Sequence, residues 1–133
     1  MLAGVADTHT AIWYLYGDKR LSARAKSFMD SAYLGDDQIG FSSITLAEIV
    51  YLEEKRKILP DTLAQFLAIV NVQDSLFVEV PFDRNIIKSL LRVPRTSVPD
   101  LPDRIIAATA LHLGVPLITR DAQIQASGIG TIW

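Results

Sequence analysis

Four acidic residues stand where an apolar, strand-like run of the chain gives way to a helix-like run. In a parallel α/β sheet the carboxyl ends of the strands lie at one edge, and ligands bind there. Acids that are far apart in the sequence can therefore meet at one point, where their mutual repulsion calls for a cation. Mg²⁺ and Mn²⁺ are hard ions that prefer oxygen ligands. We therefore expect a catalytic metal site, acting on a phosphate, formed by Asp7, Glu48, Asp103 and Asp121.

The chemistry that suits such a site is displacement at phosphorus. Two divalent ions roughly 3.5–4 Å apart can hold an attacking water and the leaving oxygen in line. Carboxylates set on strand ends and helix starts would fix that geometry. We expect one or two ions of Mg²⁺ or Mn²⁺ as cofactor.

Helix capping is the competing interpretation of the same acids. Asp7, Asp103 and Asp121 stand at expected helix starts, where an Asp N-cap contributes about 1 kcal/mol. Thr45 and Glu48 have the spacing of a capping box. Ser, Thr or Asn would cap equally well, so an acid at all four junctions favours a shared role. Two further acids, interpreted as ordinary caps, serve as a comparison: Asp61 and Asp83.

Several neighbours of the acids are candidates for binding the substrate. Thr8 and Thr119 could orient a carboxylate or a water, or cap the backbone locally. Arg104 and Arg120 could bind a phosphate, or they could form salt bridges that hold the acids in place. Asp100 could assist the metal site or serve as a loop or cap residue.

The elements that must position these residues follow from the apolar pattern. Short buried strands are expected at residues 2–6, 38–42, 76–80 and 115–119, and a fifth within 130–133. Helices are expected at residues 8–16, 22–34, 45–57, 61–72, 83–92 and 103–113, and a helix-like run follows Asp121. Strands that alternate with helices and are rich in Val, Ile and Leu predict an α/β fold, with a parallel sheet covered on both faces.

Length and composition limit the classes of protein that remain. The chain has 133 residues, of which 50% are hydrophobic, and suits a single domain over residues 1–133. It has no cysteine, which excludes a disulfide framework and thiolate metal sites. Its net charge of −2 argues against a plain basic nucleic-acid binder, although two bound divalent ions would make that charge positive. Since no apolar run reaches the roughly 18 residues of a membrane span, we expect a soluble, cytoplasmic protein without membrane attachment.

Four segments together resemble a known family. The chain is similar to the PIN domain family along VADTHTAIWYL, SSITLAEI, PDRIIAATAL and PLITRD. Within that family it resembles the toxin ribonucleases called VapC, which belong to bacterial toxin–antitoxin pairs. The resemblance implies a PIN-like fold, a parallel β-sheet in an α/β/α sandwich. It also implies a Mg²⁺- or Mn²⁺-dependent endoribonuclease that cleaves RNA with a metal-activated water, a cognate antitoxin as partner, and a homodimer.

The family's acidic residues fall on the four acids already singled out. Many relatives carry a further acid two or three residues after the last one, where this chain has Gln123 and Ile124. Without that acid, the chain has one carboxylate fewer to hold a second metal ion. Three alternatives stay open: a PIN nuclease of RNA processing or decay without an antitoxin, a catalytically silent PIN-like binding module, and a flavodoxin-like or response-regulator-like domain. The last lacks a Gly-rich phosphate loop and a suitably placed Lys.

Overall fold

The computed structural model describes residues 1–133, and its strands form one five-stranded parallel sheet. The strand order is β3-β2-β1-β4-β5, with β1 at the centre. This order differs from the 2-1-3-4-5 order of flavodoxin-like folds. The strands are β1 (Leu2–Ala6), β2 (Gln38–Ser42), β3 (Phe77–Val80), β4 (Leu117–Ile118) and β5 (Thr131–Ile132).

Seven helices connect and cover the strands. They are α1 (Thr8–Tyr16), α2 (Ala23–Leu34), α3 (Ser43–Glu54), α4 (Thr62–Val70), α5 (Arg84–Leu90), α6 (Leu101–Leu113) and α7 (Ala122–Ala126). The fifth strand and the helix after Asp121 are both present, as the sequence predicts. No helix is both long enough and apolar enough to cross a membrane.

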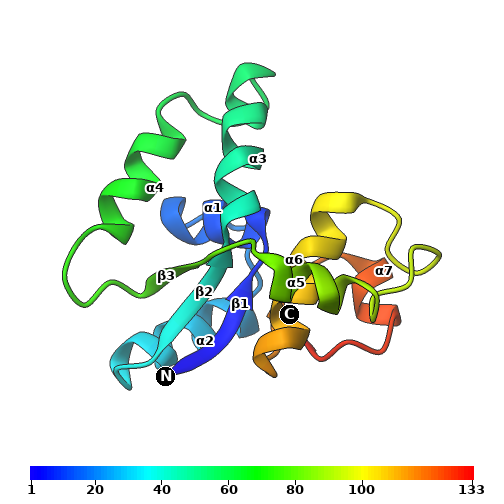
Figure 1. The fold of residues 1–133 in the computed structure, drawn as a ribbon. Coiled ribbons are helices and arrows are strands. Elements are labelled where there is room, and N and C mark those ends of the chain that lie inside the picture. Colours follow the sequence, from blue (N-terminus) through cyan, green and yellow to red (C-terminus); the bar gives the residue numbers. More distant parts are fainter.

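The two faces of the sheet pack against different helices. Ala6 and Ile118 belong to a core that includes buried residues of α1, α2, α3 and α4. Their chain neighbours Val5 and Leu117 point the other way, into a core with α5, α6 and α7. Figure 1 shows α1 and α2 on one side of the sheet and α5 and α6 on the other. The predicted α/β/α sandwich is therefore confirmed, and the alternation of strand side chains explains it.

Some predicted boundaries are wrong, and two of the errors concern the acids. α3 begins at Ser43 with Ser42 as its N-cap, so Thr45 and Glu48 lie inside the helix and form no capping box. α6 begins at Leu101, and its N-cap is Asp100. Asp103 therefore occupies the third position of the helix and is not the cap. In both cases an earlier polar residue takes the cap, since Ser and Asp are equally able to accept from the first free N–H groups.

The remaining predicted caps divide into two groups. The side chains of Asp7, Asp83 and Asp121 each accept backbone hydrogen bonds at the start of a helix, as expected. Asp61 precedes α4 with φ of 64° and accepts no such bond. Asp61 is thus not an ordinary cap, because its left-handed backbone turns the side chain away from the free amides.

The predicted strand at residues 115–119 is also shorter than expected. Only Leu117 and Ile118 pair as β4, and they pair with both β1 and β5. Pro116 has no N–H to donate to a ladder, and its carbonyl accepts from Val5 at 3.0 Å. This short central strand places Thr119 and Asp121 beside the end of β1.

Candidate active site

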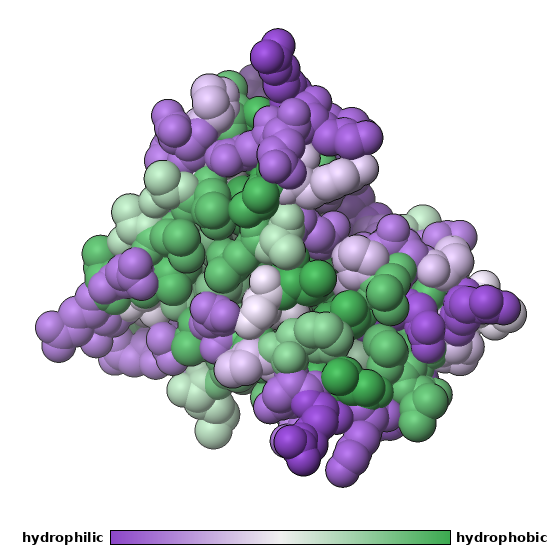
Figure 2. Space-filling model, turned by 45° about the horizontal axis from the view of Figure 1, so that its top comes forward, coloured by the Kyte–Doolittle hydropathy of each residue, from purple (hydrophilic) through white to green (hydrophobic).

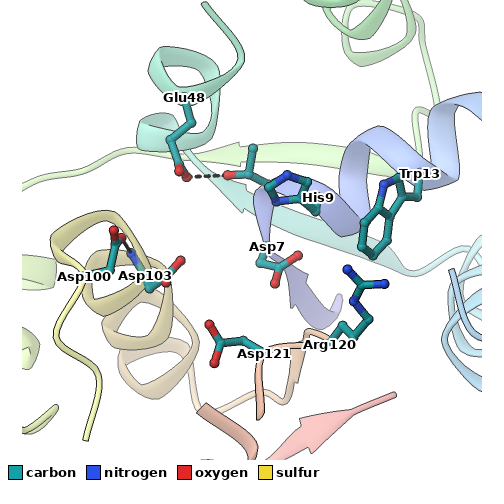
Figure 3. A pocket seen from close by; sticks show the side chains of 9 residues that line it. Asp7, His9, Trp13, Glu48, Asp100, Asp103, Arg120 and Asp121 are labelled. Atoms are coloured by element: carbon teal, nitrogen blue, oxygen red, sulfur yellow. Dashed lines mark hydrogen bonds between the residues drawn. The ribbon is translucent and has the colours of Figure 1, made fainter. Parts of the chain in front are cut away.

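A pocket of about 380 Å³ lies at the carboxyl edge of the sheet, beside the ends of β1 and β4. Figure 3 shows its acids arranged around one space, with Asp7, Asp103 and Asp121 directed into it. All four acids expected from the sequence line this pocket, together with Asp100. Its nine lining residues are Asp7, Thr8, His9, Trp13, Glu48, Asp100, Asp103, Arg120 and Asp121.

Two of the acids cap helices and line the pocket at the same time. Oδ1 of Asp7 accepts from the backbone N–H of Thr10 at 2.9 Å. Oδ1 of Asp121 accepts from the N–H groups of Gln123 and Ile124 at 2.8 and 3.1 Å. In each aspartate the backbone cap engages one oxygen, so the same side chain can also face the pocket. The capping and site interpretations are therefore compatible.

Glu48 reaches the pocket from the body of α3 and is held by a hydroxyl group of α1. The hydroxyl of Thr8 donates to Oε1 of Glu48 at 2.5 Å. Oγ1 of Thr8 also lies 3.1 Å from Oγ1 of Thr45, and both threonines are buried. Thr8 thus orients a carboxylate, which is one of the two roles considered for it.

The start of α6 contributes a pair of acids. The backbone N–H of Asp103 donates to Oδ1 of Asp100 at 3.0 Å. This capping bond holds the carboxylate of Asp100 beside that of Asp103. Asp100 is therefore a cap that also lines the pocket, and its part in the metal site stays a prediction.

The pocket disfavours negative charge on three of its acids. Burial raises the pKa of Asp7, although hydrogen bonds from Thr119 and Thr10 act in the opposite direction. Burial also raises the pKa of Glu48, against the hydrogen bond from Thr8, and repulsion by Asp100 adds to the effect. Burial raises the pKa of Asp103 to about 7, and repulsion by the other four carboxylates contributes.

No ion pair balances this charge. The three salt bridges of the protein join Met1 to Asp37, Arg20 to Asp18 and Lys26 to Asp30, and none involves an acid of the pocket. Five carboxylates therefore share a cavity whose basic lining residues are His9 and Arg120. An all-oxygen donor set with raised pKa values suits a hard divalent cation, which would stabilise the ionised forms. No three acidic or histidine side chains are arranged around a common point as a ready-made coordination shell.

The predicted basic residues have different positions from those expected. Arg104 points away from the pocket and donates to the carbonyl oxygens of Val93 and Leu90 at 2.9–3.2 Å. The salt-bridge interpretation of Arg104 is therefore wrong, because its guanidinium instead satisfies free carbonyl groups of the loop after α5. Its role in binding phosphate stays a prediction. Arg120 does line the pocket, and its guanidinium lies 4.6 Å from the centroid of the Trp13 ring. It forms no salt bridge with an acid, so its role in binding phosphate stays a prediction.

Thr119 is fully buried below the pocket. Its hydroxyl accepts from the backbone N–H of Asp121 at 3.0 Å, which is the local capping role considered for it. Its side chain also favours the charged form of Asp7. Of the two residues at which many relatives carry an acid, Gln123 is exposed and Ile124 is buried, and neither lines the pocket.

Two lining residues, His9 and Trp13, are not among the site residues expected from the sequence. His9 and Trp13 are four residues apart on α1, so they share a helix face, and their rings lie 5.5 Å apart. Burial lowers the pKa of His9. The signal that could have found them is their spacing from Asp7, which places both rings on the side of α1 that borders the acid.

A comparison with family models matches residues 5–128 to the PIN domain. The chain therefore belongs to the PIN domain family, which rules out the response-regulator-like alternative. Ribonuclease VapC22 of Mycobacterium tuberculosis is 25% identical to it over 134 residues, covering 95% of this chain and 92% of that protein.

Solved structures agree on the fold. VapBC2 from Rickettsia felis, bound to a DNA fragment from its promoter, superposes with a TM-score of 0.70 at 16% identity, covering 98% of this chain and 97% of that one. A toxin–antitoxin complex from Klebsiella pneumoniae superposes with a TM-score of 0.64 at 22% identity, covering 98% of this chain and 96% of that one. FitAcB from Neisseria gonorrhoeae superposes with a TM-score of 0.64 at 22% identity, covering 96% of this chain and 95% of that one.

Proposed function

We propose that the protein is a metal-dependent endoribonuclease that acts as the toxin of a toxin–antitoxin pair. The observation that carries the proposal is the pocket of five carboxylates without an ion-pair partner at the carboxyl edge of the sheet. Membership of the PIN family and a similar protein named as a ribonuclease support the choice of reaction.

Asp7, Glu48, Asp103 and Asp121 would hold Mg²⁺ or Mn²⁺ between them. A divalent ion there supplies positive charge for the phosphate and lowers the pKa of a water. The residues of the chain prepare the site for it. Thr8 fixes the direction of Glu48, and the cap at Thr10 fixes that of Asp7. Arg120, which lines the pocket and has no acidic partner, would bind a phosphate oxygen of the substrate.

A protein partner is supported by the surface and by the relatives. The structures from Rickettsia felis and Klebsiella pneumoniae are described as complexes of toxins with antitoxins. Figure 2 shows apolar surface, in green, over much of one face of the molecule. Large exposed apolar surfaces mark interaction sites. We therefore assign this chain an antitoxin partner and a homodimeric state. Large apolar side chains that are exposed on and near α3, α5 and α6 are Val50, Phe82, Ile87, Leu91 and Leu101.

Cleavage of RNA by Asp7 variants tests the proposal. Purified protein should cleave RNA in Mg²⁺ or Mn²⁺, and should not do so in EDTA. Asp7→Asn should lower kcat by at least about 100-fold, since a ligand of the reacting centre is lost. Its Tm should stay close to that of the wild type, because Asn also caps a helix. Asp7→Ala should lose the activity and also about 1 kcal/mol of stability.

The matched control is Asp61→Asn, since Asp61 also precedes a helix but accepts no capping bond and does not line the acidic pocket. This variant should retain full activity. Equal cleavage by Asp7→Asn and the wild type would show that any ribonuclease activity comes from elsewhere.

A further inference from the structure

A second hollow, of about 400 Å³, adjoins the acidic pocket and shares His9 and Trp13 with it. Its walls come from α1, from the turn that follows α1, and from the end of α3. Apolar side chains such as Ile12 and Ile58 form part of the wall. Any polymer bound across the acidic pocket could therefore continue directly into this hollow.

The charge of the second hollow is opposite to that of the first. Arg20, Arg56 and Lys57 line it, against a single carboxylate, that of Asp18. Asp18 is engaged by Arg20, with Nη2 to Oδ2 at 2.7 Å and Nε to Oδ1 at 3.1 Å. Arg56 and Lys57 are exposed and form no salt bridge. Two cations without partners thus stand beside a pocket that suits phosphate chemistry.

Trp13 connects the two hollows. The guanidinium groups of Arg120 and Arg20 lie 4.6 and 5.2 Å from the centroid of its ring. Arg120 lines the acidic pocket and Arg20 lines the second hollow. Figure 3 shows Arg120 beside Trp13 at the rim of the acids. Trp13 therefore lies between an arginine of the acidic pocket and an arginine of the second hollow, which Arg56 and Lys57 also line.

The backbone at Arg56 adds an independent observation. α3 ends in a Schellman motif, in which the N–H of Lys57 donates to the carbonyl of Leu52 and that of Arg56 to Glu53. Arg56 has φ of 56°, the left-handed conformation for which glycine is strongly preferred. Its neighbour Lys55 lies over the ring of Tyr51 and does not line the hollow. An arginine at this position gives up local stability and lines the hollow.

We propose that the second hollow binds phosphates of the RNA strand next to the scissile bond, with Arg56 and Lys57 as their main contacts. The proposal rests on the proposed nuclease function and specifies its substrate as a single strand that spans both hollows. Basic grooves with aromatic side chains are typical of single-strand binding. An acidic peptide would meet the same cations, but it would have no reason to continue into a pocket of five carboxylates.

Binding of RNA tests the proposal directly. The probe is a short, fluorescein-labelled single-stranded RNA, and Asp7→Asn is the background, so that the probe is not cleaved. Arg56→Ala combined with Lys57→Ala should weaken RNA binding on the order of tenfold or more. The plot of log K against log salt should also become less steep by about 1.4, which is the value for the loss of two phosphate contacts on a single strand. Lys55→Ala removes one charge from the same basic run outside the hollow and should leave the affinity nearly unchanged.

A second variant separates binding from folding. Arg56→Gly places the preferred residue at a left-handed position, so Tm should be equal or higher while the affinity for RNA falls. Cleavage is measured with the wild-type Asp7 restored. The double alanine variant and Arg56→Gly should then each show a higher KM for RNA with little change in kcat.

Three outcomes would overturn the inference. The first is an RNA affinity of the double variant equal to that of Lys55→Ala. The second is equal affinity for duplex and single-stranded RNA. The third is unchanged RNA binding with lost affinity for an acidic peptide, which would make the hollow a protein site. If the wild type cleaves no RNA but the variants still lose RNA binding, the nuclease assignment fails and the hollow stands as an RNA site.

Discussion

At the residue scale, the acids of the pocket repel one another, and no salt bridge of the protein supplies the positive charge that would balance them. Asp103 receives a raised pKa from burial and from four neighbouring carboxylates. Asp7 and Glu48 are shifted in the same direction, mainly by burial. Hydrogen bonds from Thr8, Thr10 and Thr119 hold the side chains in place but do not remove the repulsion.

The first prediction is the pH dependence of stability without metal. The pKa of Asp103 is 3.8 when unshifted and about 7 in the folded protein. Between these two pH values the folded state keeps a proton on Asp103 that the unfolded chain has released. The stabilisation is complete below the lower value and is lost as pH rises through about 7. In EDTA, Tm should therefore fall between about pH 5 and about pH 8.

Asp103→Asn should show a smaller fall in Tm, and near pH 8 it should melt about 2–6 °C above the wild type. Added Mg²⁺ should raise the Tm of the wild type more at the higher pH, where the ligands are ionised. Asp61→Asn should follow the wild-type curve. A metal-free Tm that rises across this range would contradict the prediction.

The second prediction concerns Thr8, whose hydroxyl orients Glu48 from another element. Thr8→Val keeps the shape of the side chain and removes the donor, so Mn²⁺ affinity measured by calorimetry should fall about 10-fold, as for other groups that position metal ligands. Thr8→Ser retains the donor and should bind Mn²⁺ nearly as well as the wild type. Equal affinity in Thr8→Val would show that Glu48 needs no such support.

At the element scale, helix starts and strand ends determine which acids meet. β1 and β4 are adjacent and parallel, so the residues after them, Asp7 and Asp121, emerge at the same edge. α6 then brings Asp100 and Asp103 to that edge, since its first turn begins beside the pocket. The loop between α5 and α6 must therefore be held in place.

The third prediction assigns that task to Arg104. Its guanidinium donates to carbonyls of Leu90 and Val93 at the end of α5 and in the loop. Arg104→Ala should lower the free energy of unfolding by about 1.5–3 kcal/mol, because charged hydrogen bonds are lost and carbonyl groups are left unpaired. Chemical denaturation measures this loss. RNA affinity should not change at a temperature where the variant is folded, and a selective loss of RNA affinity would restore a substrate-binding role.

At the scale of the whole molecule, the sandwich buries its two cores but leaves apolar side chains outside. Ile87 is 51% exposed and Leu91 is 88% exposed, and they lie four residues apart at α5. Both would gain from burial against a second copy or an antitoxin, which is the usual meaning of an extended apolar surface.

The fourth prediction is that α5 contributes to the homodimer. Light scattering of the isolated chain should give twice its mass of 14.7 kDa. Ile87→Glu combined with Leu91→Glu should give the monomer mass, because each charge would have to be buried at the interface. The control is Leu34→Glu at the end of α2, where the side chain is 82% exposed and lies away from α5. A dimer that survives the double change would place the interface elsewhere.

The amino-acid sequence by itself determined the fold class and the meeting of the acids. Alternating apolar strands and helices permit a parallel sheet, and in a parallel sheet the residues that follow the strands share one edge. For Asp7 and Asp121, the expected strand ends alone predict that the two side chains lie at the same edge. Glu48 and Asp103 were identified by resemblance to the family as much as by position.

Only the tertiary structure decided the directions of side chains and the cap of each helix. Asp100 caps α6 because the helix begins two residues earlier than its apolar pattern indicates. Arg104 turns away from the acids because the loop after α5 presents free carbonyl oxygens. Arg56 and Trp13 line the same hollow because the turn after α3 lies beside α1. Such contacts join residues that are distant in sequence, and periodicity along one segment carries no information about the partner that another segment supplies.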